Sequence, residues 1–130
     1  MAKAGTVLVV EDTKNLRDII AFTLRGRGWE VIESGDGDDA LQKATTMEPD
    51  LIILDVMLPG KTGFEICSIL KGDERLRHIP ILFLSAITQG SGKSDEHWRQ
   101  LSNADAFISK PFRAHQLVQS VEELLGRKAK

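Results

Sequence analysis

The chain has 130 residues, of which 42% are hydrophobic and 28% are charged, and its formal net charge is −2. These values are ordinary for one globular domain with a single core, and they give no electrostatic reason to expect direct binding to nucleic acid. No run approaches the roughly 18 apolar residues of a membrane helix, and Cys67, the only cysteine, cannot form an internal disulfide, so we expect no membrane insertion and a cytoplasmic location.

The first part of the chain alternates between strand-like and helix-like segments. The apolar run at 6–10 predicts a strand. A helix that Gly28 is placed to end is predicted next, with a buried stripe formed by Leu16, Ile19, Ile20, Thr23 and Leu24. A second strand is expected at 29–33, where apolar and polar residues alternate as on an edge strand, and a short helix is expected around 40–44.

The second part of the chain repeats this alternation. The expected elements are strands at 51–54, 81–84 and, more weakly, 106–108, and helices over 63–70, 94–103 and 117–125. The helical signal is thinnest between Ser94 and Asn103, where Trp98 and Leu101 are the main apolar anchors. Alternating strands and helices predict an α/β domain over 1–130, with a doubly wound parallel sheet and a short basic tail at 127–130.

Polar side chains follow four of the five predicted strands. Glu11 and Asp12 follow the first strand, Asp55 the third, Ser85 the fourth and Lys110 the fifth. Because the carboxyl ends of parallel strands meet at one edge of a sheet, these groups are expected to converge in the crevice beyond that edge. Neighbouring carboxylates repel one another unless a proton or a cation joins them, and carboxylate oxygens are ligands that Mg²⁺ prefers. An aspartate at such a site can attack phosphorus and form an acyl phosphate.

These motifs resemble those of a bacterial response-regulator receiver domain. The resemblance runs from about Thr6 to Leu125 and is carried by "VLVVEDT", "ESGDGDDAL", "PDLIILDVMLPGKTGFEIC", "IPILFLSA" and "ADAFISKPF". It implies a flavodoxin-like fold with a five-stranded parallel sheet in the order 2-1-3-4-5 and five helices. It also implies a phosphorylation-dependent switch of a two-component phosphorelay, which is a regulator and not an enzyme in the ordinary sense. A sensor histidine kinase or a phosphotransfer protein would donate the phosphoryl group to Asp55, and the domain would catalyse its own phosphorylation and a slow dephosphorylation.

The resemblance also implies a metal site. Asp12 and Asp55 would bind Mg²⁺ through their side chains, and Met57 would bind it through its backbone carbonyl. Glu11 would assist through a metal-bound water. Mn²⁺, another hard cation, could take the place of Mg²⁺.

The same resemblance assigns the remaining positions. Ser85 and Lys110 would bind phosphoryl oxygens, Ala86 would leave room beside them, and the Lys110–Pro111 peptide bond is expected to be cis. Phe107 would be the switch aromatic, turning into space that Ser85 vacates, although a plain core role for this strand residue is the alternative. The face formed by the fourth helix, the fifth strand and the fifth helix would then change shape and engage a partner.

The segment "GSGKS" at 90–94 raises a different hypothesis, a nucleotide-binding P-loop. That motif requires a first glycine at position 87, and the residue there is Ile87, which adopts positive φ poorly. The P-loop hypothesis also leaves the acidic residues and Lys110 without a role. We therefore interpret the segment as part of a lengthened loop, since 24 residues separate Ser85 from Lys110.

Two further expectations concern signalling. Met57 and Ile87 are apolar and flank the path that the hydrolytic water takes in the family, so slow self-dephosphorylation is expected. The last helix leaves little chain for an output domain, so we expect the domain to dock to an unknown downstream protein, and a phosphorylation-dependent homodimer is left open. The alternative function is a pseudo-receiver that binds partners without phosphorylation.

Overall fold

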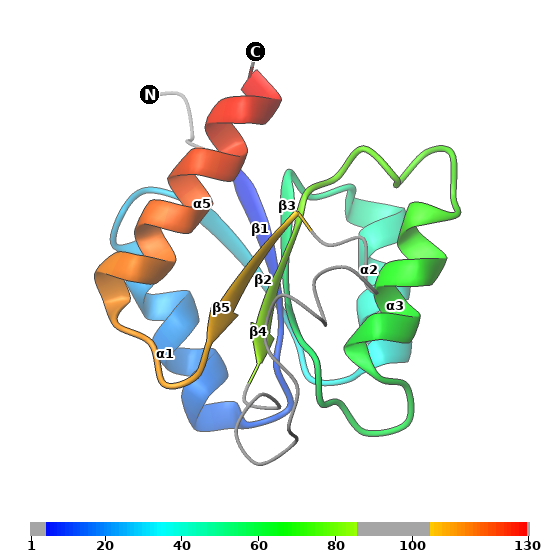
Figure 1. Cartoon of the computed structure of the whole chain (residues 1–130), viewed down its shortest axis with the longest axis horizontal. Helices are drawn as coiled ribbons and strands as arrows, with labels where there is room; N and C mark the ends of the chain where they lie inside the picture. Colours follow the sequence, from blue (N-terminus) through cyan, green and yellow to red (C-terminus); the bar gives the residue numbers. More distant parts are fainter. Residues whose placement is uncertain (1–4, 86–104, 130) are drawn as a thin grey trace.

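The computed structural model describes residues 5–85 and 105–129 (Figure 1). Its elements in chain order are β1 (Thr6–Val10), α1 (Lys14–Arg25), β2 (Glu30–Ser34), α2 (Gly37–Met47), β3 (Leu51–Asp55), α3 (Gly63–Lys71), β4 (Ile81–Ser85), β5 (Ala106–Ser109) and α5 (Ala114–Ala129). The helix expected over 94–103, the glycine-rich segment before it, Ala86 and Ile87 lie outside the described residues. α5 continues through Ala129, so the basic end expected as a tail at 127–130 is helical up to that residue.

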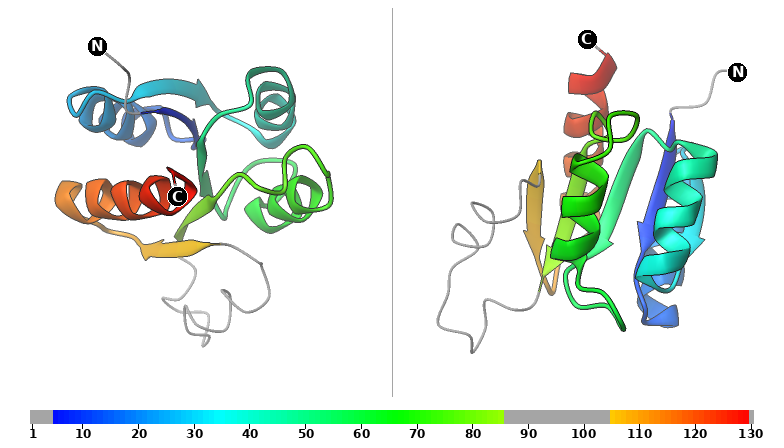
Figure 2. Two further views of the ribbon diagram at one scale, coloured as in Figure 1. Left: turned by 90° about the horizontal axis from the view of Figure 1, so that it is seen from above. Right: turned by 90° about the vertical axis from the view of Figure 1, so that its right-hand side faces the viewer.

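The strands form one parallel sheet in the order β2-β1-β3-β4-β5, as expected. α1 and α5 cover one face of the sheet, and α2 and α3 cover the other (Figure 2). All strands therefore end at the same edge, which lies at the bottom of Figure 1. Among the described helices, none is both long and apolar enough to span a membrane.

The central strands are buried on both faces, which explains why their sequences are continuously apolar. Successive side chains of a strand point to opposite faces, so Val7 and Val9 pack in the layer under α1 and α5, whereas Leu8 and Val10 pack in the layer under α2 and α3. Each of these four side chains is at most 1% exposed. The strands end where these apolar runs meet polar residues, so Glu11 follows β1 and Asp55 is the last residue of β3.

The helix ends explain two local features of the sequence. At the end of α1, the Gly28 N–H donates to the Arg25 carbonyl at 3.0 Å and the Trp29 N–H to the Leu24 carbonyl at 3.3 Å. This pair of bonds is a Schellman motif with Gly28 at φ 94°. α1 itself ends at Arg25 with Gly26 as its C-cap, so Gly28 closes the turn after the helix and is not the C-cap that the sequence predicted. α3 begins with a capping box between Thr62 and Glu65.

One expected core position is wrong. The apolar spacing predicts that Ile19 lies on the buried side of α1, but Ile19 is 60% exposed, whereas Ala21 is buried. The apolar stripe of α1 is wider than the surface that the sheet offers, so part of the stripe remains outside the core.

Candidate functional site at the carboxyl edge of the sheet

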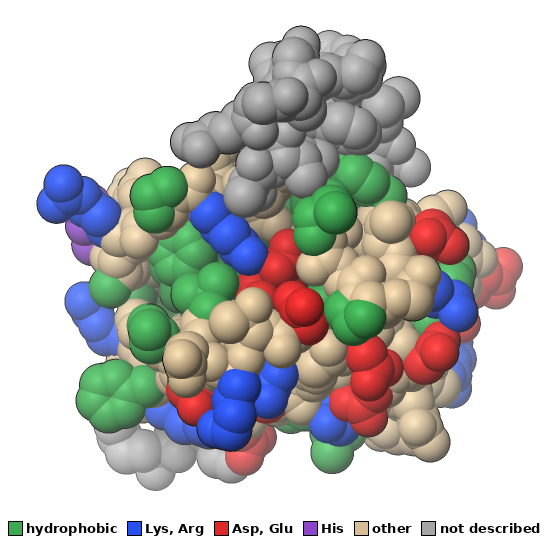
Figure 3. Space-filling view, turned by 90° about the horizontal axis from the view of Figure 1, so that it is seen from below, with side chains coloured by type: hydrophobic (Ala, Val, Ile, Leu, Met, Phe, Trp, Pro, Cys, Tyr) green, Lys and Arg blue, Asp and Glu red, His purple; other side chains and the backbone are tan. Residues whose placement is uncertain are grey.

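The ends of β1 and β3 and the residue after β5 bring acidic and basic side chains together. Figure 3, viewed toward this edge, shows acidic side chains gathered near the centre of the face, next to basic and apolar ones. Glu11, Asp12 and Asp55 each place a carboxylate oxygen within 4.8 Å of the others. Glu11 and Asp55 are buried, at 0% and 4% exposure, whereas Asp12 is exposed. The predicted convergence of the three carboxylates is therefore observed.

Lys110 bridges the two buried carboxylates. Its Nζ lies 2.8 Å from Asp55 Oδ2 and 3.1 Å from Glu11 Oε1, so it donates a hydrogen bond to each. The other oxygen of each carboxylate accepts a backbone N–H two residues further along the chain. Thr13 N donates to Glu11 Oε2 at 3.0 Å, and Met57 N donates to Asp55 Oδ1 at 3.0 Å. Both carboxylates are thus fixed in orientation before any ligand arrives.

The charges of the site are not balanced by the lysine alone. Burial, and then hydrogen bonding to Asp55, raise the pKa of Glu11 from 4.5 to about 7. Burial by itself would lower the pKa of Lys110, but the hydrogen bonds and charges of Asp55 and Glu11 raise it overall. One ammonium faces three carboxyl groups, so excess negative potential remains. Oxygen ligands with one member open to solvent fit a hard divalent cation that keeps part of its water shell.

The backbone around Asp55 is held from two sides. Val56 N donates to the Leu84 carbonyl at 3.1 Å, and the Val56 carbonyl accepts from Gly63 N at 2.7 Å. A Cβ on Gly63 would lie 2.8 Å from Val56 Cα and still closer to the Asp55 carbonyl oxygen. Only a glycine lets the first turn of α3 approach the strand end this closely.

Sequence reasoning missed two residues that support the site. Periodicity places Gly63 only within the helix expected over 63–70, although its place in "PGKTGFE" could indicate a close approach of two backbones. Arg17 was not singled out at all, yet its Nη1 donates to the Glu11 carbonyl at 2.8 Å. No local sequence pattern predicts this contact, because it depends on how the chain reverses direction between β1 and α1.

The other predicted positions that the structure describes lie at this edge or, for Phe107, within β5. Ser85 is fully buried at the end of β4, opposite Ser109 of β5. Phe107 is half-buried and packs edge-on against Phe83, with ring centroids 5.4 Å apart. Met57 is 60% exposed. The peptide bond after Lys110 is cis, as expected.

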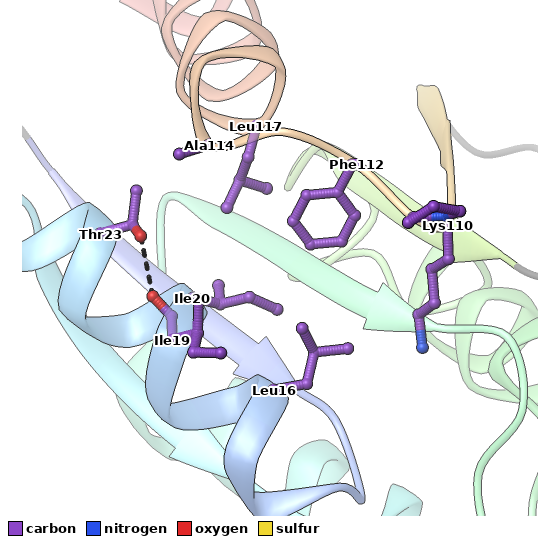
Figure 4. A pocket seen from close by; sticks show the side chains of 9 residues that line it. Leu16, Ile19, Ile20, Thr23, Lys110, Phe112, Ala114 and Leu117 are labelled. Carbon is purple, nitrogen blue, oxygen red and sulfur yellow. Dashed lines mark hydrogen bonds between the residues drawn. The ribbon is translucent and has the colours of Figure 1, made fainter.

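An apolar groove of about 520 Å³ opens beside Lys110 (Figure 4). Its walls come from α1, from the loop after β5 and from the start of α5. Leu16, Ile19, Phe112 and Leu117 are among the residues that line it. The exposed part of the α1 stripe therefore forms one wall of a groove next to the charged site.

Comparison with known proteins identifies what this arrangement is similar to. The family model described as the response regulator receiver domain matches residues 7–122. The polar-differentiation response regulator DivK of Brucella ovis is 34% identical over 121 residues, which cover 93% of this chain and 96% of DivK. The DNA-binding response regulator MtrA of Mycobacterium tuberculosis is 37% identical, but the match covers 50% of its length, so the chain spans about half of that relative.

Solved structures agree with the sequence relatives. The chemotaxis response regulator CheY4 of Vibrio cholerae superposes with a TM-score of 0.82 at 31% identity, covering 92% of this chain and 97% of CheY4. The signal receiver domain of a signal transduction histidine kinase from Syntrophus aciditrophicus gives a TM-score of 0.82 at 32% identity, covering 94% and 90% of the two chains.

Proposed function

Because the chain belongs to the response regulator receiver domain family, it is a signalling protein of the two-component type, and we propose that Asp55 is its phosphoryl acceptor. The observation that carries this proposal is the geometry of Asp55, a buried carboxylate held by Lys110 at 2.8 Å and by Met57 N at 3.0 Å. In the reaction, a carboxylate oxygen of Asp55 forms a bond to phosphorus while the bond from phosphorus to a histidine nitrogen of the donor breaks. The imidazole leaves with the bonding electron pair.

Lys110 has two roles in this proposal. Before transfer, its ammonium offsets the charge of Asp55 and Glu11 and keeps the Asp55 carboxylate oriented. After transfer, it pairs with a phosphoryl oxygen, because the new group carries negative charge and strong acceptor oxygens within reach of the same Nζ. Ser85, at the end of the neighbouring strand, is proposed to donate to another phosphoryl oxygen.

The acidic residues are proposed to hold Mg²⁺, or Mn²⁺ in its place. The spacing of the Glu11, Asp12 and Asp55 oxygens, all within 4.8 Å, supports a shared cation. Asp12 and Asp55 would be direct ligands together with the Met57 carbonyl, and Glu11 would act through a bound water. The bound cation would offset charge on the transferring phosphoryl group.

The donor is proposed to be a sensor histidine kinase or a phosphotransfer protein. A protein that reaches Asp55 must contact the edge around Lys110, and the apolar groove there gives it a surface to bury (Figure 4). Phe22, which is 81% exposed on α1, extends the apolar surface of this helix. Large exposed apolar patches on a protein surface commonly mark sites of contact with another protein. We also propose a cytoplasmic location, where such a donor would present its histidine.

The output is proposed to pass through β5 and α5. Phosphorylation would draw Ser85 toward Asp55, and Phe107, now packed against Phe83, would turn inward. The helix expected over 94–103 lies outside the described residues, so this proposal is argued from β5 and α5 alone. The downstream target is an unidentified protein, and a phosphorylation-dependent homodimer is left open. MtrA is named as DNA-binding, but this chain matches only half of its length. The net charge of −2 gives no electrostatic reason to propose direct binding of nucleic acid by this chain.

A chemical-shift experiment tests the switch. Mg²⁺ with beryllofluoride, a phosphoryl mimic, should move amide signals of β5 and α5 in the wild-type protein and leave them in place in Asp55→Asn. Glu74→Gln is a matched control, because this side chain is 88% exposed on the loop after α3 and lies outside the acidic site. Its signals should respond like those of the wild type. Equal responses in Asp55→Asn and the wild type would contradict the proposal.

A further inference from the structure

Arg17 connects the acidic site to the edge strand. Its Nη1 donates to the backbone carbonyl of Glu11 at 2.8 Å, and its Nε lies 3.5 Å from Glu33 Oε1 on β2. The side chain is only 19% exposed, although it starts on the first turn of α1. Gly35 leaves room for the guanidinium, since a Cβ there would lie 3.1 Å from Arg17 Nη1.

The carbonyl that Arg17 holds belongs to the peptide group joining Glu11 to Asp12. On the other side of the same residue, Glu11 N donates to the Ser34 carbonyl at 3.0 Å. Because a peptide group is planar, a hydrogen bond that holds the Glu11 carbonyl also holds the position of Asp12 Cα, which lies in the same plane. Arg17 and Ser34 together determine how the chain exits β1.

Asp12 depends on this backbone more than its two acidic neighbours do. The carboxylates of Glu11 and Asp55 are each held by Lys110 and by a backbone N–H. Among residues 5–85 and 105–129, no hydrogen bond or ion pair holds the Asp12 carboxylate. Its distance to the other carboxylates is therefore set by the direction in which its backbone points.

We infer that Arg17 is a positioning residue for the divalent cation: through the Glu11 carbonyl it directs the Asp12 carboxylate toward Asp55. The inference rests on the metal site of the proposed function. It assigns Arg17 no contact with the cation itself.

A purely electrostatic role for Arg17 predicts the opposite sign. A guanidinium close to three carboxylates repels a divalent cation, so its removal would tighten cation binding if charge were its only contribution. The ion pair with Glu33 reduces that repulsion. The direction of the change in Mg²⁺ affinity therefore distinguishes positioning from charge.

The test measures Mg²⁺ binding to the unphosphorylated protein by calorimetry and by amide chemical shifts. Arg17→Met should weaken Mg²⁺ binding about tenfold, the size expected from losing one charge-assisted hydrogen bond. Arg25→Met is the matched control. Arg25 lies on the same helix and pairs with the same Glu33 at 3.2 Å, but its second hydrogen bond goes to the Val31 carbonyl and not to the site. The control should bind Mg²⁺ like the wild type.

Unchanged or tighter Mg²⁺ binding by Arg17→Met would overturn the positioning role while leaving the proposed function intact. A wild-type protein that binds no Mg²⁺ would overturn both. If Arg17→Met does not fold, Arg17→Lys, which keeps the charge and one donor, should still bind Mg²⁺ more weakly than Arg25→Lys, and equal affinities would refute the inference.

Discussion

Replacing Gly63 by alanine tests how strongly the site depends on close backbone packing. The new methyl group would lie 2.8 Å from Val56 Cα and closer still to the Asp55 carbonyl oxygen. These are backbone atoms of a buried strand end, so neither can rotate away, and β3 or α3 must move. Overpacking of this kind costs about 1–3 kcal/mol. For a domain of this length the melting temperature should fall by about 4–12 °C.

Two other glycines provide controls. Gly37 is the first residue of α2, as Gly63 is of α3, but its Cβ would meet Ile66 Cδ1 at 2.7 Å, which is the end of a flexible side chain. Gly37→Ala should therefore lose less stability than Gly63→Ala. A Cβ on Gly126, within α5, meets nothing within 4 Å, so Gly126→Ala should gain up to about 1 kcal/mol from helix propensity.

The assay combines urea unfolding with the rate of phosphoryl labelling by acetyl phosphate. The free energy of unfolding should decrease in the order Gly126→Ala, wild type, Gly37→Ala, Gly63→Ala. Because displacements of about 1 Å at a reacting group can cost about 10²-fold in rate, labelling of Gly63→Ala should fall at least about tenfold. If Gly63→Ala matches Gly37→Ala in both stability and labelling, the close approach of α3 to Asp55 does not support the site.

Three further changes test separate parts of the structure. Asp105→Ala should lower the free energy of unfolding by about 1 kcal/mol or more, because Asp105 Oδ2 accepts from Ile81 N at 2.8 Å and Lys71 Nζ at 3.0 Å; an unchanged urea midpoint would contradict this. In metal-free protein, burial raises the pKa of Glu11 from 4.5 to about 7, so folding takes up a proton between these values and the contribution of Glu11 to stability decreases as pH rises through them. Glu11→Gln should flatten the pH dependence of thermal unfolding in that window, and an unaltered slope would count against the shift. Met57→Asn should shorten the lifetime of the phosphoryl group, since an amide can orient a water where an exposed thioether cannot; equal phosphate release from both proteins would refute this.

The strand pattern was predictable because it follows from burial on both faces. Continuous apolar runs such as 6–10 and 51–54 can hardly be exposed strands, and the alternation with helices then requires parallel neighbours. Once the strands are parallel, the convergence of Glu11, Asp55 and Lys110 follows from topology.

What could not be predicted depends on how elements approach one another. Periodicity on α1 shows that Ile19 is apolar, but it does not show how much of the helix the sheet covers. The need for glycine at position 63 arises only when α3 meets the end of β3. Likewise, Arg17 reaches the Glu11 carbonyl because the chain reverses between β1 and α1, and no local pattern records that reversal.

The central claim is that folding builds one phosphoryl-accepting, cation-dependent pocket around Asp55. Incubation with acetyl phosphate and Mg²⁺, followed by peptide mass spectrometry, tests it most directly. We predict one added phosphoryl group on Asp55, which is absent from Asp55→Asn and absent when a chelator removes the cation. Labelling that persists in Asp55→Asn, or that appears on another residue of the wild type, would contradict it.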